Sequence, residues 1–287
     1  MRKVSVLLVV ALVAAACSSG TTTSTGSSDG GGGFRDPLDV VRGSVAAARA
    51  AKTATVEMNL YLEYEDSNLL LPGKGELDLA KGVGEFTFDL GALYESFVDV
   101  PAGVPTKMQM AFTNTVMYMR VPGAVTSLPG GKQWIEIDMT EFAKAGARNE
   151  TPYGIGSSDP DGMFDILTGV TVARQRGTEQ IRGIDTTRYE VVIDARKAVR
   201  AVPPAQRAAM RQAMKAFGSR RFEMEVWISG DGLVRKQTVE VPSDLGKSIM
   251  DIFYSGYGEP VIVDLPPRSK TYKLRDASEI GRIFGGG

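Results

Sequence analysis

Period-two alternation of apolar and polar residues is the feature of this sequence that most restricts its fold. Between residues 54 and 64, apolar side chains recur at every second position, with mostly polar ones between them. This pattern is typical of a β-strand that has one buried face and one face in water. It returns, with turn residues such as Lys81-Gly82 and Gly230-Asp231-Gly232 between segments, in 75–80, 83–90, 106–112, 115–121, 132–139, 171–177, 185–194, 220–229, 233–241 and 248–257. The turns indicate hairpins.

A few segments follow helical spacing instead. Asp36-Pro37 supplies an N-cap and a first-turn proline, and apolar residues three and four apart predict a helix of about 15 residues after it. Asp159-Pro160 repeats this arrangement before a helix that ends near Gly169. Pro203-Pro204 precedes a third helix. The tail predicts an extended segment over 261–265 and a short terminal helix.

The order of these elements predicts the fold class. Long runs of strands separated by single helices favour an antiparallel α+β fold over the strict strand–helix alternation of a parallel sheet. About 10–11 strands are more than a flat open sheet tolerates, so the sheet must curl. We therefore predict a curled antiparallel β-sheet, a half-barrel wrapped around a few helices.

The N-terminus reads as a targeting segment. Residues 1–16 combine two basic residues, an apolar stretch too short to span a bilayer and three alanines, which predicts a signal peptide. Cys17 follows directly, and the arrangement resembles the lipobox of bacterial lipoproteins, although Ala14 replaces the usual Leu or Val. The resemblance implies lipidation of Cys17 by acyl chains such as palmitate. An ordinary secreted protein with an incidental cysteine is the alternative.

The segment after the cysteine separates it from the folded body. Residues 17–33 consist mostly of Ser, Thr and Gly, which predicts a disordered tether spanning roughly 20–25 Å. Residues 34–287 form the predicted globular domain. Together these features predict a protein anchored by lipid in the cell membrane, with its body on the extracytoplasmic face.

Composition excludes several classes of chemistry. The chain has no histidine, which removes Ser-His-Asp and Cys-His catalysis and imidazole metal sites. Its single cysteine removes disulfides and thiolate zinc sites. A balance of 33 basic and 34 acidic residues lacks the basic excess of a nucleic-acid-binding protein. We expect no enzyme activity, no catalytic residues, no metal, no cofactor and no nucleic-acid partner.

The order and spacing of several segments are similar to a known family. These segments are 52–60 (KTATVEMNL), 73–80 (GKGELDLA), 116–123 (VMYMRVPG), 131–139 (GKQWIEIDM), 159–170 (DPDGMFDILTGV), 177–194 and 226–236 (VWISGDGLVRK). Over roughly residues 37–265 the chain resembles actinobacterial envelope lipoproteins of the LppX/LprG type, whose fold is LolA-like. The resemblance implies an apolar cavity that binds acyl chains of lipids or glycolipids, and a role in carrying or presenting them. An envelope transporter is a candidate partner.

If such a cavity exists, its wall is the apolar face of the strands. The candidate lining residues are Val56, Met58, Leu60, Leu62, Phe86, Phe88, Met108, Met110, Met117, Met119, Ile135, Ile137, Tyr189, Val191, Met224 and Ile252. Methionine is flexible and polarisable, which suits a wall that adapts to varied chains. Methionine also fills ordinary cores, and alternation alone does not distinguish the two.

A basic cluster surrounds the Pro203 helix. It comprises Arg200, Arg207, Arg211, Lys215, Arg220 and Arg221. The cluster is either an ordinary solvated helix face or a contact for anionic lipid headgroups.

Two other functions stay open beside lipid binding. One is a scaffold or sensor lipoprotein that acts through a protein–protein surface, and the other is a hydrolase whose acidic pair meets only in the fold.

Overall fold

The structure, a computed structural model, describes residues 36–64, 67–92, 95, 105–113, 115–122, 128–139, 162–204, 207–216, 218–243, 246–275 and 279. All of them belong to one compact unit, Arg35–Gly287. The predicted signal peptide, Cys17 and the tether lie outside the described residues, and so does most of the predicted terminal helix. The predictions about these segments stay predictions.

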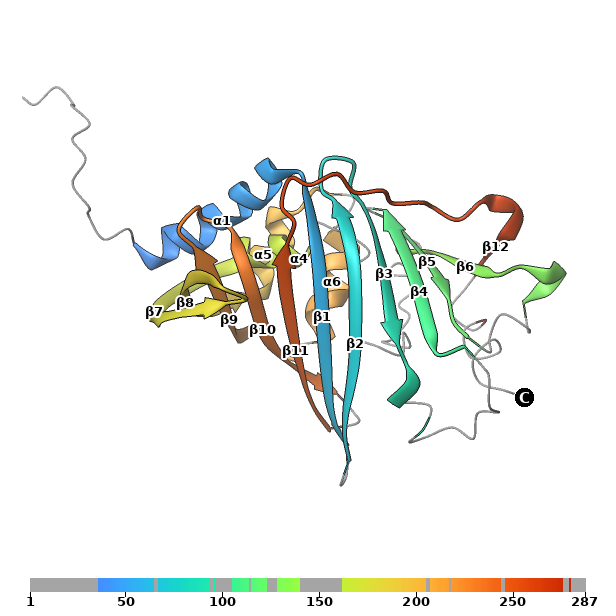
Figure 1. Ribbon diagram of the computed structural model, residues 1–287, viewed down its shortest axis with the longest axis horizontal. Helices are drawn as coiled ribbons and strands as arrows, with labels where there is room; N and C mark the ends of the chain where they lie inside the picture. The colour runs from blue at the N-terminus through green and yellow to red at the C-terminus, as the bar shows by residue number, and fades with distance from the viewer. Residues whose placement is uncertain are drawn as a thin grey trace, which may run out of the picture. The chain divides into compact units, whose positions relative to one another are not determined.

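Twelve strands form one curled sheet in the order β12-β6-β5-β4-β3-β2-β1-β11-β10-β9-β8-β7 (Figure 1). Neighbours pair antiparallel except β12 and β6, which pair parallel. The strands are β1 (Thr53–Tyr64), β2 (Ser67–Asp78), β3 (Val83–Asp89), β4 (Lys107–Thr113), β5 (Val116–Arg120), β6 (Trp134–Asp138), β7 (Val170–Ile181), β8 (Ile184–Asp194), β9 (Arg221–Ser229), β10 (Val234–Ser243), β11 (Gly246–Ser255) and β12 (Thr271–Lys273). The predicted fold class is confirmed.

Two meanders make up the sheet. The first runs outward from β1 to β6, and the second runs inward from β7 to β11. They meet where β1 pairs with β11, so that Met58 lies opposite Ile252. The sheet is thus continuous across segments almost 200 residues apart in the chain.

The helices lie on one face of this sheet. They are α1 (Pro37–Ala51), α4 (Gly162–Asp165), α5 (Ala195–Ala201) and α6 (Arg207–Ala216), with short 3₁₀ turns η2 (Pro129–Gly131), η3 (Ile166–Gly169) and η4 (Arg268–Lys270). As predicted, the Asp36 carboxylate accepts from the Leu38 N–H at the start of α1. Although α1 directly precedes β1, it packs chiefly on β7, and Arg42 donates to the Val170 carbonyl at 2.9 Å.

The core is one apolar cluster that joins the buried face of the sheet with residues of the helices. Alternate strand residues point inward, as in β3, where Phe86 and Phe88 are buried and stack with ring centroids 6.0 Å apart. Helix α1 contributes Val41, Val45 and Ala48 to the same cluster. The alternation of apolar residues therefore becomes a single apolar interior.

Four elements differ from the sequence prediction. Strand β2 begins at Ser67, well before the predicted segment 75–80, and ends at Asp78. The predicted count of strands is slightly low because β12 has only three residues, too few to show alternation. Its parallel pairing depends on a long connection after β11. Helix α5 was not predicted, although Asp194 followed by helix-forming residues resembles a capped start. The helix predicted after Asp159 is described only as α4 and η3, because the residues before Gly162 lie outside the described ranges.

Candidate functional site

The structure brings the predicted lining residues to one face of the sheet. Fourteen of the sixteen are no more than 6% exposed and belong to one apolar cluster. Met110 on β4 lies directly opposite Met119 on β5, and Phe112 lies opposite Met117. Leu60 and Leu62, toward the far end of β1, are half-buried and lie outside that cluster.

The burial of these residues decides whether the apolar face of the sheet lines an open space in this conformation. A side chain that lines a space large enough for water, enclosed or open, has accessible surface in that space. The fourteen buried residues have almost none, so neighbouring atoms cover them in place of water. In this conformation they form a core, and their role in lining a lipid site stays a proposal.

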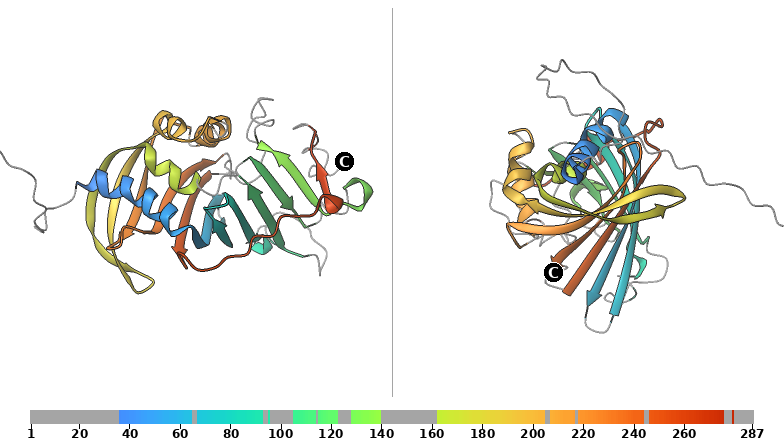
Figure 2. Two further views of the ribbon diagram at one scale, coloured as in Figure 1. Left: turned by 90° about the horizontal axis from the view of Figure 1, so that it is seen from above. Right: turned by 90° about the vertical axis from the view of Figure 1, so that its left-hand side faces the viewer.

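A groove is present on the helices instead. It has a volume of about 590 Å³ and is formed by α5, α6 and the segment that leads into β9. Figure 1 shows α5 and α6 behind the strands, and Figure 2 shows the two helices close together on that face. The lining residues are Ala195, Arg196, Val199, Arg200, Arg211, Met214, Gly218, Ser219 and Arg220.

Local interactions fix the two helices that form the groove. The Asp194 carboxylate caps α5 by accepting from the N–H groups of Arg196 and Lys197 at 2.9 and 3.3 Å. Gly169 allows close packing beneath α5, because a Cβ there would lie 2.9 Å from the Ala198 Cβ. Arg207 ties α6 to α5 by donating to the carbonyls of Val202 and Arg200.

The groove combines an apolar floor with a cationic rim. Met214 is 6% exposed and Ala195 is 9% exposed, whereas the four arginines are exposed. Within the described ranges, the guanidinium groups of Arg196, Arg200 and Arg211 have no hydrogen-bond or ion-pair partner. Arg220 lies 3.8 Å from Asp194. The site can therefore receive an anionic group together with apolar atoms beneath it.

Asp194 stays charged beside these arginines. Burial favours a higher pKa for this carboxyl, but the N–H donors of Arg196 and Lys197 and the charges of Arg220 and Arg221 outweigh it and lower the pKa. The carboxylate thus serves the helix start, and the nine lining residues include no carboxylate of their own.

The sequence located this region only in part. Arg200, Arg207, Arg211 and Arg220 belong to the predicted basic cluster, and Arg207 turns out to link the helices. Arg196, Ala195 and Val199 were not predicted as site residues because α5 was not predicted. The N-cap pattern at Asp194 is the signal that identifies them.

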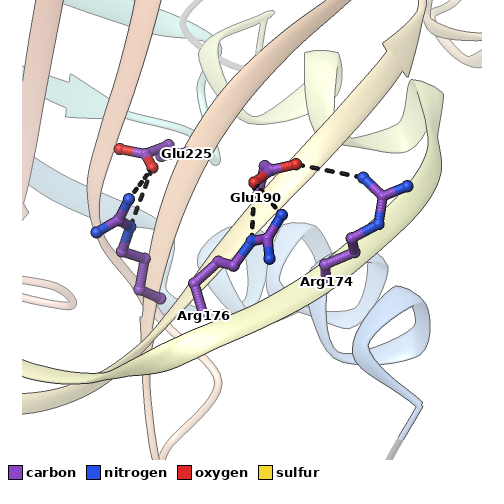
Figure 3. Close-up of polar contacts among 5 residues, drawn as sticks. Arg174, Arg176, Glu190 and Glu225 are labelled. Atoms are coloured by element: carbon purple, nitrogen blue, oxygen red, sulfur yellow. Dashed lines mark hydrogen bonds and ion pairs between the residues drawn. The ribbon is translucent and has the colours of Figure 1, made fainter.

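Glu190 on β8 and Glu225 on β9 are engaged in ion pairs. On the outer face, the Glu190 carboxylate lies between Arg174 and Arg176, at 3.2 and 2.8 Å, and Arg188 pairs with Glu225 (Figure 3). These contacts cross β7, β8 and β9 and are typical of a structural cross-strand ladder. They leave neither Glu190 nor Glu225 free, whereas Glu76 and Glu85 face each other across β2 and β3 without an ion pair to a described residue.

The described part of the chain holds neither a metal-binding cluster nor a membrane-crossing helix. No group of three acidic or cysteine side chains there converges so as to hold a metal ion. Among its helices, none has the length and hydropathy required to cross a membrane.

Comparison with known proteins gives weak but consistent likenesses. No protein-family model matches the chain. An uncharacterized 31.2 kDa protein from the rplA–rplJ intergenic region of Streptomyces griseus is 23% identical over 250 residues, which is 85% of this chain and 80% of that protein.

The matching solved structures include two mycobacterial lipoproteins. LppX of Mycobacterium tuberculosis is 16% identical, with 79% of this chain and 97% of that chain covered and a TM-score of 0.47. LprF of Mycobacterium bovis is also 16% identical, with 80% and 96% covered and a TM-score of 0.43. LppX, the lipoprotein type that the sequence resembles, is therefore among the solved structures that the chain matches.

Proposed function

We propose that this chain is a membrane-anchored envelope lipoprotein that binds the acyl chains of lipids or glycolipids and carries or presents them. Cys17 would hold the anchor on the extracytoplasmic face of the cell membrane, and residues 17–33 would tether the body. An envelope transporter is the proposed protein partner. The binding step is reversible burial, without covalent chemistry.

The observation that carries this proposal is the methionine content of the interior. Nine of the twelve methionines are no more than 6% exposed, and they come from both the sheet and the helix layer. Met210 and Met214 come from α6, Met139 directly follows β6, and the other six lie on strands. A core of unbranched, polarisable side chains can repack around a guest more easily than a core of branched ones.

Binding in this scheme requires the helix layer to shift from the sheet. An acyl chain that enters would replace contacts among methionines with contacts to its own methylenes. Each methylene removed from water contributes about 0.8 kcal/mol, so a long chain can offset the cost of displacing the helices. The predicted lining residues would then become the wall of the opened space.

Native mass spectrometry of residues 34–287, purified without detergent from a lipid-containing host, tests this function. We expect adducts with lipid masses that organic extraction removes. The matched control is the stripped protein, which should regain the adducts when it is incubated with envelope lipids. A single ligand-free mass both before and after that incubation would contradict lipid binding.

A second candidate function is supported by the packing itself. A scaffold or sensor lipoprotein needs only a filled core that presents a surface, and the fourteen buried lining residues fit that description. The same experiment separates the two functions, because a scaffold retains no lipid in either preparation.

A further inference from the structure

The basic residues of this chain are concentrated around the α5–α6 groove. Residues 195–222 contain eight basic residues and no acidic one. Removing these eight from the total of 33 leaves 25 basic against 34 acidic residues in the rest of the chain. A nearly neutral protein therefore carries one strongly positive region. Its basic residues are Arg196, Lys197, Arg200, Arg207, Arg211, Lys215, Arg220 and Arg221.

We propose that the α5–α6 groove binds the phosphate-bearing headgroup of an anionic phospholipid within a bilayer, and so docks this face on the membrane. The proposal goes beyond acyl-chain binding in the interior and does not depend on it. A body that is anchored to a membrane by a tether meets such headgroups at high local concentration.

The side chains fit this ligand chemically. Arg196 and Arg200 lie one helical turn apart on α5, and Arg211 approaches from α6 across the groove. Guanidinium groups bind phosphate oxygens through paired N–H donors. These three have no partner among the described residues, so binding breaks no ion pair with any of those residues.

The floor of the groove distinguishes a lipid from a free phosphate ion. Val199, which is half-buried, and the small exposed parts of Ala195 and Met214 present apolar surface beneath the arginines. The glycerol and first methylenes of a phospholipid can cover that surface, which inorganic phosphate cannot do. A volume of about 590 Å³ is within the usual range for small-molecule sites.

Vesicle sedimentation tests the proposal with residues 34–287, which include the whole compact unit Arg35–Gly287. The two vesicle types are phosphatidylcholine alone and phosphatidylcholine mixed with phosphatidylglycerol. We expect binding to the mixed vesicles, little binding to the neutral ones, and weakening with added salt. Excess inorganic phosphate, at constant ionic strength, should not displace the protein from the mixed vesicles.

Substitutions locate the binding on the groove. The triple variant Arg196→Gln, Arg200→Gln, Arg211→Gln should weaken binding on the order of a hundredfold. Its control, Lys52→Gln, Lys74→Gln, Lys107→Gln, removes equal charge from exposed positions outside the groove and should bind nearly as the parent does. All of these positions are exposed, so the variants should fold, as their melting curves will show.

A third variant tests whether the space in the groove matters independently of its charge. Ser219→Phe places a ring in the groove without changing the charge, and it should weaken binding to mixed vesicles. Equal binding of the groove and control triple variants, or of neutral and mixed vesicles, would overturn the proposal. So would unchanged binding by Ser219→Phe, which would show diffuse attraction to the surface. Lipid adducts in the interior test a separate property, because vesicle docking requires no extraction of lipid.

Discussion

Tyr254 lies in β11 and Tyr257 lies two residues beyond its end, and only the Tyr257 hydroxyl has a hydrogen-bond partner among the described residues. The Tyr257 hydroxyl donates to the Val234 carbonyl at 2.7 Å. The Tyr254 hydroxyl is buried and has no hydrogen-bond partner among the described residues, while its ring lies 4.8 Å from that of Phe164. Burial raises the pKa of both hydroxyls, so each stays neutral. The Tyr257 hydroxyl therefore contributes a hydrogen bond, whereas the Tyr254 hydroxyl loses its hydration without a compensating hydrogen bond to a described residue.

Replacement of each tyrosine by phenylalanine should have opposite effects. Tyr254→Phe removes a buried polar atom without a partner and should leave the free energy of unfolding unchanged or raise it by up to about 1 kcal/mol. Tyr257→Phe leaves the Val234 carbonyl without its donor and should lower that free energy by about 1 kcal/mol. Urea unfolding of both variants measures the difference. Equal losses would contradict the assigned environments.

Capping of α5 by Asp194 predicts a stability effect that depends on pH. Asp194→Ala removes the cap and should cost about 1 kcal/mol near pH 7. Because the folded pKa of Asp194 is lowered, its contribution is complete above the unfolded value of about 4 and is lost as pH falls through the folded pKa. The loss in the alanine variant should therefore shrink in acid. Asp194→Asn, which keeps a capping oxygen, is the control and should restore much of the stability near pH 7.

Glu85 should be destabilising near neutral pH. It lies directly opposite Glu76 across β2 and β3. Burial raises the pKa of Glu85, and the charges of Glu76 and Asp264 raise it further. Stability is therefore gained as pH falls through the raised pKa. Glu85→Gln should melt at a higher temperature than the parent near pH 7, and this advantage should disappear at a pH well below 4.

Glu190→Gln is the matched control of opposite sign. The hydrogen bond from Arg176 lowers the pKa of Glu190, so its charged form contributes to stability at neutral pH. This variant should melt at a lower temperature than the parent near pH 7, and the deficit should close in acid. Thermal melts of both glutamine variants across this pH range provide the measurement. Parallel behaviour of the two would contradict the assigned signs.

Two glycines should respond differently to alanine. A Cβ at Gly75 on β2 would meet the Glu85 carbonyl and would lie 2.7 Å from the Phe86 ring. Gly75→Ala should therefore destabilise the fold by roughly 1–3 kcal/mol. Gly43 lies within α1 with no atom near its Cβ position, and Gly43→Ala should stabilise by about 0.5–1 kcal/mol. Chemical denaturation measures both, and a loss at Gly43 would contradict an open position there.

The sequence predicted what depends on local pattern. Alternation identified the inward residues of β4 and β5, and the registers confirm that Met110 and Met119 face the same side. The Asp36-Pro37 cap located α1 to within its first residue. These features follow from residues close together in the chain, which is why a single sequence contains them.

The rest depends on contacts between distant segments. Alternation does not say whether an apolar face is covered or lines an open space, and the burial of Phe88 and Met108 is seen only in the folded chain. The groove likewise needs α5 and α6 side by side, which Arg207 secures through two carbonyls. Three of its four arginines belong to the basic cluster predicted from the sequence, but Arg196 and the apolar floor were not predicted.

The pairing of β1 with β11 has a consequence for how this protein is made. Strand β1 is among the first elements to be synthesised, yet its partner on one side arrives almost 200 residues later. Such non-local pairing gives a high contact order and slow folding. During synthesis, the first meander would have an unpaired central edge with Val56 and Met58 beside it, and such an edge is prone to aggregation. Any cell that makes this chain must therefore protect the unpaired edge of β1 until β11 of the second meander pairs with it.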